Sequence, residues 1–138
     1  MRVKLIAVAH IDHPLHHYGR ELISQDLKAH RHIVVRDSGS QRDQWTTSVE
    51  VDQRWTVSNI QTSIQAVSMG LGFAWLPALQ ITAQLNHRLL APLPLKEGGV
   101  IETPLYLIFP KPDFVGPGVK HLAGIIRQLA RSEAPCYE

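Results

Sequence analysis

A chain of 138 residues is long enough for one domain with its own hydrophobic core. Hydrophobic residues make up 44% and charged residues 19%, which excludes a disordered or fibrous chain. The formal net charge is only +2, and the 14 Lys and Arg residues are scattered. A DNA-binding face needs cations gathered along one helix or stripe, so the sequence does not predict one.

The cysteine content and the apolar runs limit the cellular context. The single cysteine, Cys136, cannot form an intrachain disulfide or a CxxC metal site. No stretch reaches the roughly 18 apolar residues of a membrane span, and the first residues lack the pattern of a secretory signal. We therefore expect a cytoplasmic protein.

The first half of the chain alternates short apolar runs with polar or proline-broken segments. The apolar runs are rich in β-branched residues, which predicts buried strands at residues 3–9, 33–35 and 54–57. His13-Pro14 disfavours helical geometry, so residues 10–21 are expected to be a loop. Ser24 can cap a short helix that ends near His30.

The second half begins with the clearest helix signal of the sequence. Ser58 and Asn59 are good N-cap residues, and the apolar positions of residues 60–69 recur at helical spacing up to Gly70, which ends the helix. A strand at 72–76, a helix from 77 to about 85, an extended segment at 89–95, a strand at 104–109 and a helix at 117–131 follow. The last helix carries an apolar stripe formed by Val119, Leu122, Ile126 and Leu129.

Strands that alternate with helices across short connections are typical of parallel βαβ units. The predicted fold class is therefore α/β, with a parallel-rich sheet and flanking helices. The strands at 33–35, 54–57 and 72–76 are expected to be neighbours in that sheet.

Residues 53–77 (QRWTVSNIQTSIQAVSMGLGFAWLP) read as a strand, a helix ending in Gly-x-Gly and a strand ending in proline. This order resembles the most recognisable stretch of the effector domains of LysR-type transcriptional regulators. The segments VKLIAVAHIDHPL, DLKAHRHIVVRDSG and TPLYLIFPK resemble further elements of that family in the same order. The ordered set is specific, although each piece alone is weak.

The resemblance implies the two-lobed fold of type 2 periplasmic binding proteins. Residues of about 10–95 would form the second lobe, while 1–9 and 100–138 would supply crossover strands and a terminal helix that complete the first lobe. A complete regulator also carries a winged helix-turn-helix, a linker helix and the first half of the sensing domain. We expect those parts to be absent from this chain.

Three segments contain residue types that occur in cofactor, catalytic or metal sites, but their order or spacing favours a structural role. Gly70-Leu71-Gly72 follows a helix and precedes a strand, which is the reverse of a dinucleotide-binding loop, so no cofactor is predicted. Residues 37–39 offer Asp, Ser and Gly but no GxSxG elbow, so no hydrolase is predicted. Four histidines within residues 10–17 lack the convergence that a zinc site needs, and we expect them to be solvated. They are His10, His13, His16 and His17.

The tryptophans could pack in the core or line a pocket. Trp55 and Trp75 lie in the two strands that flank the helix at 60–69, so packing in the core or beneath a cleft is expected for both. The sequence does not decide between these two roles for Trp45.

A ligand site is expected at the carboxyl ends of two neighbouring strands, where open α/β sheets bind their ligands. Two segments follow those ends, and the resemblance implies that both face the cleft between lobes. Capping and ordinary turns would use the same residue types, so that alternative stays open. The candidate ligand-binding residues are Asp37, Ser38, Gly39, Ser40, Ser58, Asn59 and Ile60.

We therefore expect a ligand-sensing and dimerisation module of a LysR-type regulator, without catalytic activity, metal or cofactor. Its predicted partners are a small organic anion and a second copy of itself, and it would make no direct contact with nucleic acid or membrane. Self-association is expected because the strands at 3–9 and 104–109 would otherwise leave unpaired edges. The alternative is a solute-binding protein of a transport system with the same fold; an enzyme is the third possibility.

Overall fold

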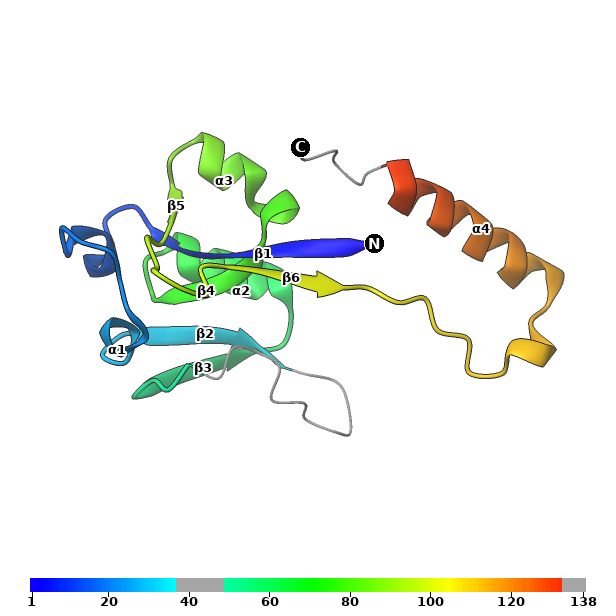
Figure 1. The fold of residues 1–138 in the computed structure, drawn as a ribbon, viewed down its shortest axis with the longest axis horizontal. Coiled ribbons are helices and arrows are strands. Elements are labelled where there is room, and N and C mark those ends of the chain that lie inside the picture. The colour runs from blue at the N-terminus through cyan, green and yellow to red at the C-terminus, as the bar shows by residue number, and fades with distance from the viewer. Residues whose placement is uncertain (37–48, 133–138) are drawn as a thin grey trace. The chain divides into compact units, whose positions relative to one another are not determined.

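The computed structural model describes residues 1–36 and 49–132. Within them, six strands form one sheet in the order β3-β2-β4-β1-β5, and β6 also pairs with β1 (Figure 1). The strands are β1 (Arg2–His10), β2 (Arg31–Val35), β3 (Gln53–Val57), β4 (Phe73–Pro77), β5 (Leu90–Pro92) and β6 (Val100–Pro104). The helices are η1 (Pro14–His17), α1 (Ser24–Leu27), α2 (Ile60–Ser68), η2 (Ala78–Ile81), α3 (Thr82–Asn86), η3 (Pro112–Phe114) and α4 (Pro117–Ser132).

The predicted α/β class and the predicted group of three neighbouring strands are confirmed. β2 pairs in parallel with β3 on one side and with β4 on the other. β1 is antiparallel to both β4 and β5, so the sheet is mixed around a parallel core. The helix predicted to open at Pro77 starts one residue later, as η2, and continues as α3.

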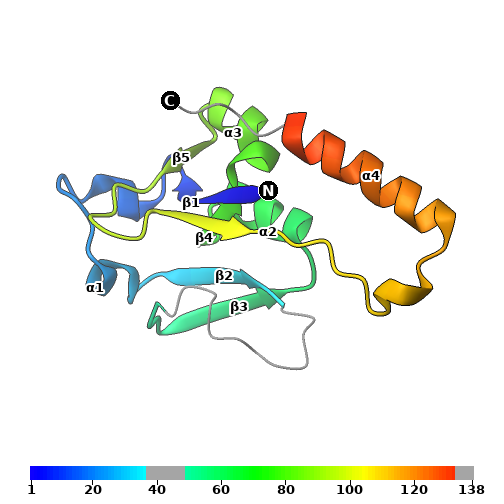
Figure 2. The ribbon, with the colours of Figure 1, turned by 45° about the vertical axis from the view of Figure 1, so that its right-hand side comes forward.

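Each face of the sheet carries its own apolar cluster. Alternate residues of β1 and β4 enter the two clusters, because successive side chains of a strand point to opposite faces. α2 covers one face and packs against β2 and β4 (Figure 2). The cluster beneath α2 consists of Ile6, Val8, Ile33, Ile64, Val67, Ala74, Leu76, Ile81 and Leu90. The cluster on the other face consists of Ala7, Ala9, Leu15, Leu22, Leu27, Phe73 and Leu93.

The two glycines after α2 have separate structural duties. Gly70 has a φ of +77°, which ends the helix in the left-handed conformation as predicted. At Gly72 a Cβ atom would lie 2.4 Å from the carbonyl oxygen of Arg31. Gly72 therefore lets the chain entering β4 pass very close to the start of β2.

The start of α1 differs from the prediction. Ser24 is the first helical residue and not the cap, and the helix ends at Leu27. The amide of Ile23 instead donates to the Asp26 carboxylate at 2.9 Å. The start of the helix is thus held by the carboxylate of its third residue and not by a Ser24 cap.

The strand predicted at 104–109 is wrong. β6 ends at Pro104, and the last main-chain bond toward β1 runs from the amide of Leu105 to the carbonyl of Met1 at 2.9 Å. Residues 105–109 pair with no strand of the described chain. The expectation of an unpaired β1 is also wrong, since β1 pairs with β4, β5 and β6.

The chain divides into two compact units, Lys4–Ile101 and Met1–Val3 with Glu102–Glu138. The second unit contains α4, which the sequence predicted almost to the residue. In α4 only Ala123 is buried, and the whole predicted apolar stripe is exposed. No helix of the described residues has both the length and the apolar content to cross a membrane.

Candidate functional site

β2 and β3 end side by side at one edge of the sheet. Val35 and Val57 are paired in register, and the amide of Arg36 donates to the carbonyl of Val57 at 2.8 Å. The segments that follow the two strands therefore leave the sheet at the same place. This is the edge at which ligands settle in open α/β sheets.

The structure describes only part of the predicted ligand site. Ser58, Asn59 and Ile60 lie between the end of β3 and the first turn of α2. The candidates of the β2 loop lie outside the described residues, so their part of the site stays a prediction. These are Asp37, Ser38, Gly39 and Ser40.

Asn59 is committed to capping α2. Its side-chain oxygen accepts a hydrogen bond from the amide of Thr62 at 2.9 Å and another from the Thr62 hydroxyl at 3.0 Å. Its amide nitrogen donates to the Ser58 hydroxyl at 3.3 Å. Asn59 thus shapes the helix terminus, and Ser58 is the exposed hydroxyl beside it.

Backbone donors remain at this terminus. The first bond inside α2 runs from the amide of Ser63 to the carbonyl of Asn59, so the amides of Ile60 and Gln61 precede the intrahelical ladder. Amides at a helix N-terminus and the helix dipole favour an anion there. The α2 terminus therefore presents two main-chain donors that no intrahelical bond uses.

Arg36 is a further candidate that the sequence prediction left out. It is exposed and follows β2 directly, with its backbone held against Val57. Its backbone therefore leaves β2 beside the end of β3, and an arginine side chain carries a positive charge and paired donors that suit a carboxylate. The signal was present in the sequence, since Arg36 is the first residue after the apolar run.

A buried histidine, His32, lies on β2. His32 is 3% exposed, and its ring stacks on Phe73 with centroids 5.0 Å apart. Burial, and to a smaller degree the charge of Arg54, lowers the pKa of His32 to about 4. Its Nδ1 atom has no hydrogen-bond partner among the described residues, so the ring acts as a neutral part of the core.

The histidine loop and Trp55 differ from expectation. His13 is 7% exposed and therefore buried, whereas solvation was predicted for all four loop histidines.

Trp55 is 43% exposed, because β3 is the edge strand next to β2. The guanidinium carbon of Arg31 lies 3.9 Å from the centre of the Trp55 ring. Trp75 is half-buried and donates to the carbonyl of Gly98 at 2.8 Å, in agreement with a packing role.

Two further features of the described residues bear on ligand binding, namely metal-ligand clusters and a groove. Within residues 1–36 and 49–132, no three His, Cys, Asp or Glu side chains lie close enough together to hold a metal ion. In the unit that contains α4, a groove of about 170 Å³ has apolar walls and two cations. Its lining residues are Phe109, Pro112, Val115, Lys120, Ala123 and Arg127.

Comparison with known families decides the class of this protein. The family model of the LysR substrate binding domain matches residues 1–131. The chain belongs to this family. Comparison with curated protein sequences gives no match.

Solved structures share the LysR-type fold at low sequence identity. The regulatory domain of Synechocystis PCC6803 CcmR, solved in complex with 2-PG, has a TM-score of 0.64 and 15% identity over 94% of this chain and 64% of that one. The effector binding domain of a BenM variant has a TM-score of 0.58 and 18% identity over 99% of this chain and 67% of its own. The bromide-bound regulatory domain of HypT from Salmonella typhimurium has a TM-score of 0.50 and 17% identity over 74% and 48%. The LysR-type chain described here thus spans about two thirds or less of each.

Proposed function

We propose that this LysR-family chain is the ligand-sensing module of a transcriptional regulator. It binds a small organic anion at the carboxyl edge of β2 and β3, and this binding controls transcription. The observation that carries the proposal is the shared edge: the Arg36 amide is bonded to the Val57 carbonyl, and α2 begins three residues after Val57, at Ile60. The proposal includes no catalytic step and no cofactor. A regulator of this kind would work in the cytoplasm.

The relatives support a small ligand. The Synechocystis domain was solved with 2-PG and the Salmonella domain with a bromide ion. An ion of that charge is what the α2 terminus and Arg36 would attract. The helix dipole contributes only about 0.3 to 1 kcal/mol at an exposed site, so this half of a cleft should bind weakly, near millimolar.

A thermal-shift screen of small organic acids tests the proposal. At ten times Kd, one bound acid should raise the melting temperature by about 5 °C. Asn59→Asp keeps the cap, because aspartate caps helices as well as asparagine, but it places a negative charge in the anion site. We expect it to abolish the shift while the melting temperature without ligand stays close to that of the unaltered protein.

Asn86→Asp is the matched control, because it makes the same change at the exposed C-terminal end of α3. It should leave the shift intact. The site assignment fails if no acid stabilises the protein, or if Asn59→Asp and Asn86→Asp respond equally to a hit.

The proposal also includes self-association. Large apolar side chains of α4 are exposed, with Leu122 at 56% and Leu129 at 57%. Exposed apolar surface of this extent is usually covered by another chain. Light scattering at tens of micromolar should therefore give a dimer or larger, and Leu122→Glu should shift the mass toward the monomer. Gln128→Glu, on the same helix but off the stripe, should not. A monodisperse monomer would contradict the expectation.

A further inference from the structure

The segment between β1 and β2 holds a connected group of polar side chains around a buried histidine. His13 packs beside His30, with ring centroids 5.2 Å apart. Its Nδ1 atom accepts a hydrogen bond from the amide of Leu15 at 3.1 Å and so caps η1. This bond requires an unprotonated Nδ1 atom, since a protonated imidazole has no acceptor.

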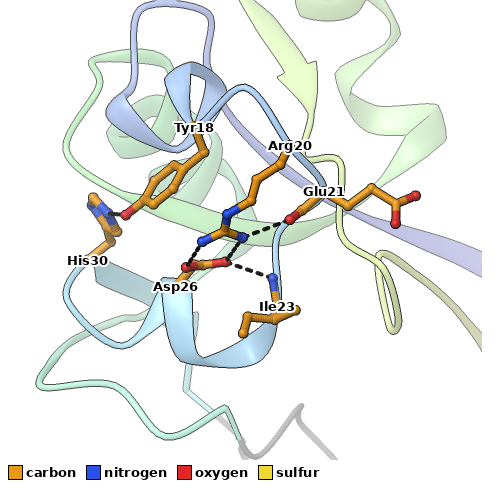
Figure 3. Close-up of polar contacts among 6 residues, drawn as sticks. All are labelled: Tyr18, Arg20, Glu21, Ile23, Asp26 and His30. Atoms are coloured by element: carbon orange, nitrogen blue, oxygen red, sulfur yellow. Dashed lines mark hydrogen bonds and ion pairs between the residues drawn. The ribbon is translucent and has the colours of Figure 1, made fainter.

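The group continues from His30 to the start of α1 (Figure 3). The Tyr18 hydroxyl lies 3.1 Å from Nε2 of His30, and the Arg20 guanidinium lies 5.5 Å from the Tyr18 ring centre. Arg20 also donates two hydrogen bonds of 2.8 Å to Asp26, whose carboxylate accepts from the amide of Ile23. The side chains thus tie the loop to the short helix.

The charged groups around His13 all oppose its protonation. The pKa of His13 is lowered to about 4, mainly by burial and to smaller degrees by the neighbouring rings of His30, His16 and His10, in that order. The Nε2 atom of His16 lies 3.3 Å from the carbonyl oxygen of Ala9, and the Nδ1 atom of His10 lies 3.9 Å from a carboxylate oxygen of Asp12. Burial also lowers the pKa of His30, and Asp26 opposes that effect only in part.

Protonation of His13 would therefore remove the η1 cap and put a positive charge beside the half-buried ring of His30. The segment is held to the rest of the fold by the buried side chains of Leu15, Leu22 and Leu27, which belong to one apolar cluster. Main-chain bonds also run from the Leu22 amide to the Pro94 carbonyl at 2.8 Å and from the Lys96 amide to the Leu22 carbonyl at 2.9 Å. All three leucines come from one contiguous stretch of chain, which is the usual unit of local opening.

We propose that this group is an acid-operated latch: protonation of His13 releases residues 11–30 from the face of the sheet while the strands stay paired. The latch is closed when His13 is neutral, because the cap and the His13–His30 contact both hold. Any surface or partner contact that residues 11–30 make is then released by acid.

Hydrogen exchange tests the latch. The amides of Leu15, Lys28 and His30 report on the segment, and those of Ala7 and Leu93 report on the sheet. The pKa of His13 is about 4 in the closed state, against an ordinary value of 6.5 once the segment opens. This difference makes the opening equilibrium about 20-fold more favourable at pH 5 than at pH 7. After correction for intrinsic exchange, the segment amides should lose protection by about that factor.

His13→Asn separates the latch from general acid unfolding. Asparagine can keep the η1 cap but does not titrate, so the acid loss in residues 11–30 should shrink to a few-fold while the acid loss of the sheet remains. His17→Asn, an exposed position of the same η1 helix, should behave as the unaltered protein.

The latch is refuted if residues 11–30 and the sheet lose protection by equal factors, or if His13→Asn keeps the full acid loss. Should His13→Asn fail to fold, an NMR titration of the His13 ring in the unaltered protein decides. A midpoint well below 6.5 that coincides with the loss of the Leu15 amide signal supports the latch. A midpoint at 6.5 or above overturns it.

Discussion

Lowering the pH from 7 to 4 is expected to remove about 3 kcal/mol from the free energy of unfolding through His32 alone. The folded protein holds the pKa of His32 at about 4, whereas the unfolded chain titrates near 6.5. Below 6.5 the unfolded state binds more protons than the folded one, so stability falls until the folded state also takes up the proton near pH 4. Above 6.5 the stabilisation is fully present.

Urea denaturation followed by tryptophan fluorescence between pH 7 and pH 4 measures this loss. His32→Leu keeps roughly the volume and removes the titration, so it should lose about 3 kcal/mol less over the same range. Some acid loss should persist, because His13 also titrates. His87→Leu, at an exposed position, should keep the full pH dependence. Equal pH dependence in His32→Leu and His87→Leu would show that His32 is not the acid-sensitive group.

Gly72→Ala is expected to destabilise the protein by about 2 kcal/mol. The new Cβ would stand 2.4 Å from the carbonyl oxygen and 3.2 Å from the carbonyl carbon of Arg31. Both contacts are backbone atoms, so β2 and β4 must move apart, and forced repacking of this kind costs about 1 to 3 kcal/mol. The loss of chain entropy in the unfolded alanine variant offsets less than about 1 kcal/mol of it.

Gly99→Ala is the matched control, because its nearest contact would be the Leu95 Cβ at 3.4 Å. Its melting temperature should stay within a few degrees of the unaltered protein, while Gly72→Ala falls by about 5 to 10 °C. If Gly72→Ala is as stable as Gly99→Ala, then β2 and β4 do not approach as closely as described.

The elements with strong local signals were predictable from the sequence. α2 has a cap at Asn59, a helical apolar period and a glycine that ends it at Gly70, and all three signals act within the helix itself. That β2, β3 and β4 are neighbours in a parallel-rich sheet followed from the alternation of strands and helices, although their order did not. The signals of each element lie within short stretches of chain, which is why a single sequence contains them.

The failures concern residues whose state depends on distant parts of the chain. Residues 105–109 are apolar enough for a strand, but a strand also needs a neighbour, and none of the described strands pairs with this segment. Trp55 reads as a core residue until β3 is known to be an edge strand. His13 and His32 are buried by tertiary packing that no local pattern reveals.

The sheet edge at which the site is proposed was predictable, but the contacts made there were not. The sequence shows that Arg36 follows the apolar run of β2, whereas the bonds from Asn59 to Thr62 and from Arg36 to Val57 required coordinates. The part of the prediction at residues 37–40 lies outside the described chain.

NMR mapping of a stabilising organic acid tests the central claim most directly. We predict that the largest amide shifts on titration fall on Arg36 and on residues 58–62, because the free amides of Ile60 and Gln61 lie in this segment and Arg36 leaves β2 beside the end of β3. Asn59→Asp should remove these shifts. Shifts confined to residues 109–127, around the groove that contains Lys120 and Arg127, would contradict the assignment and place the anion elsewhere.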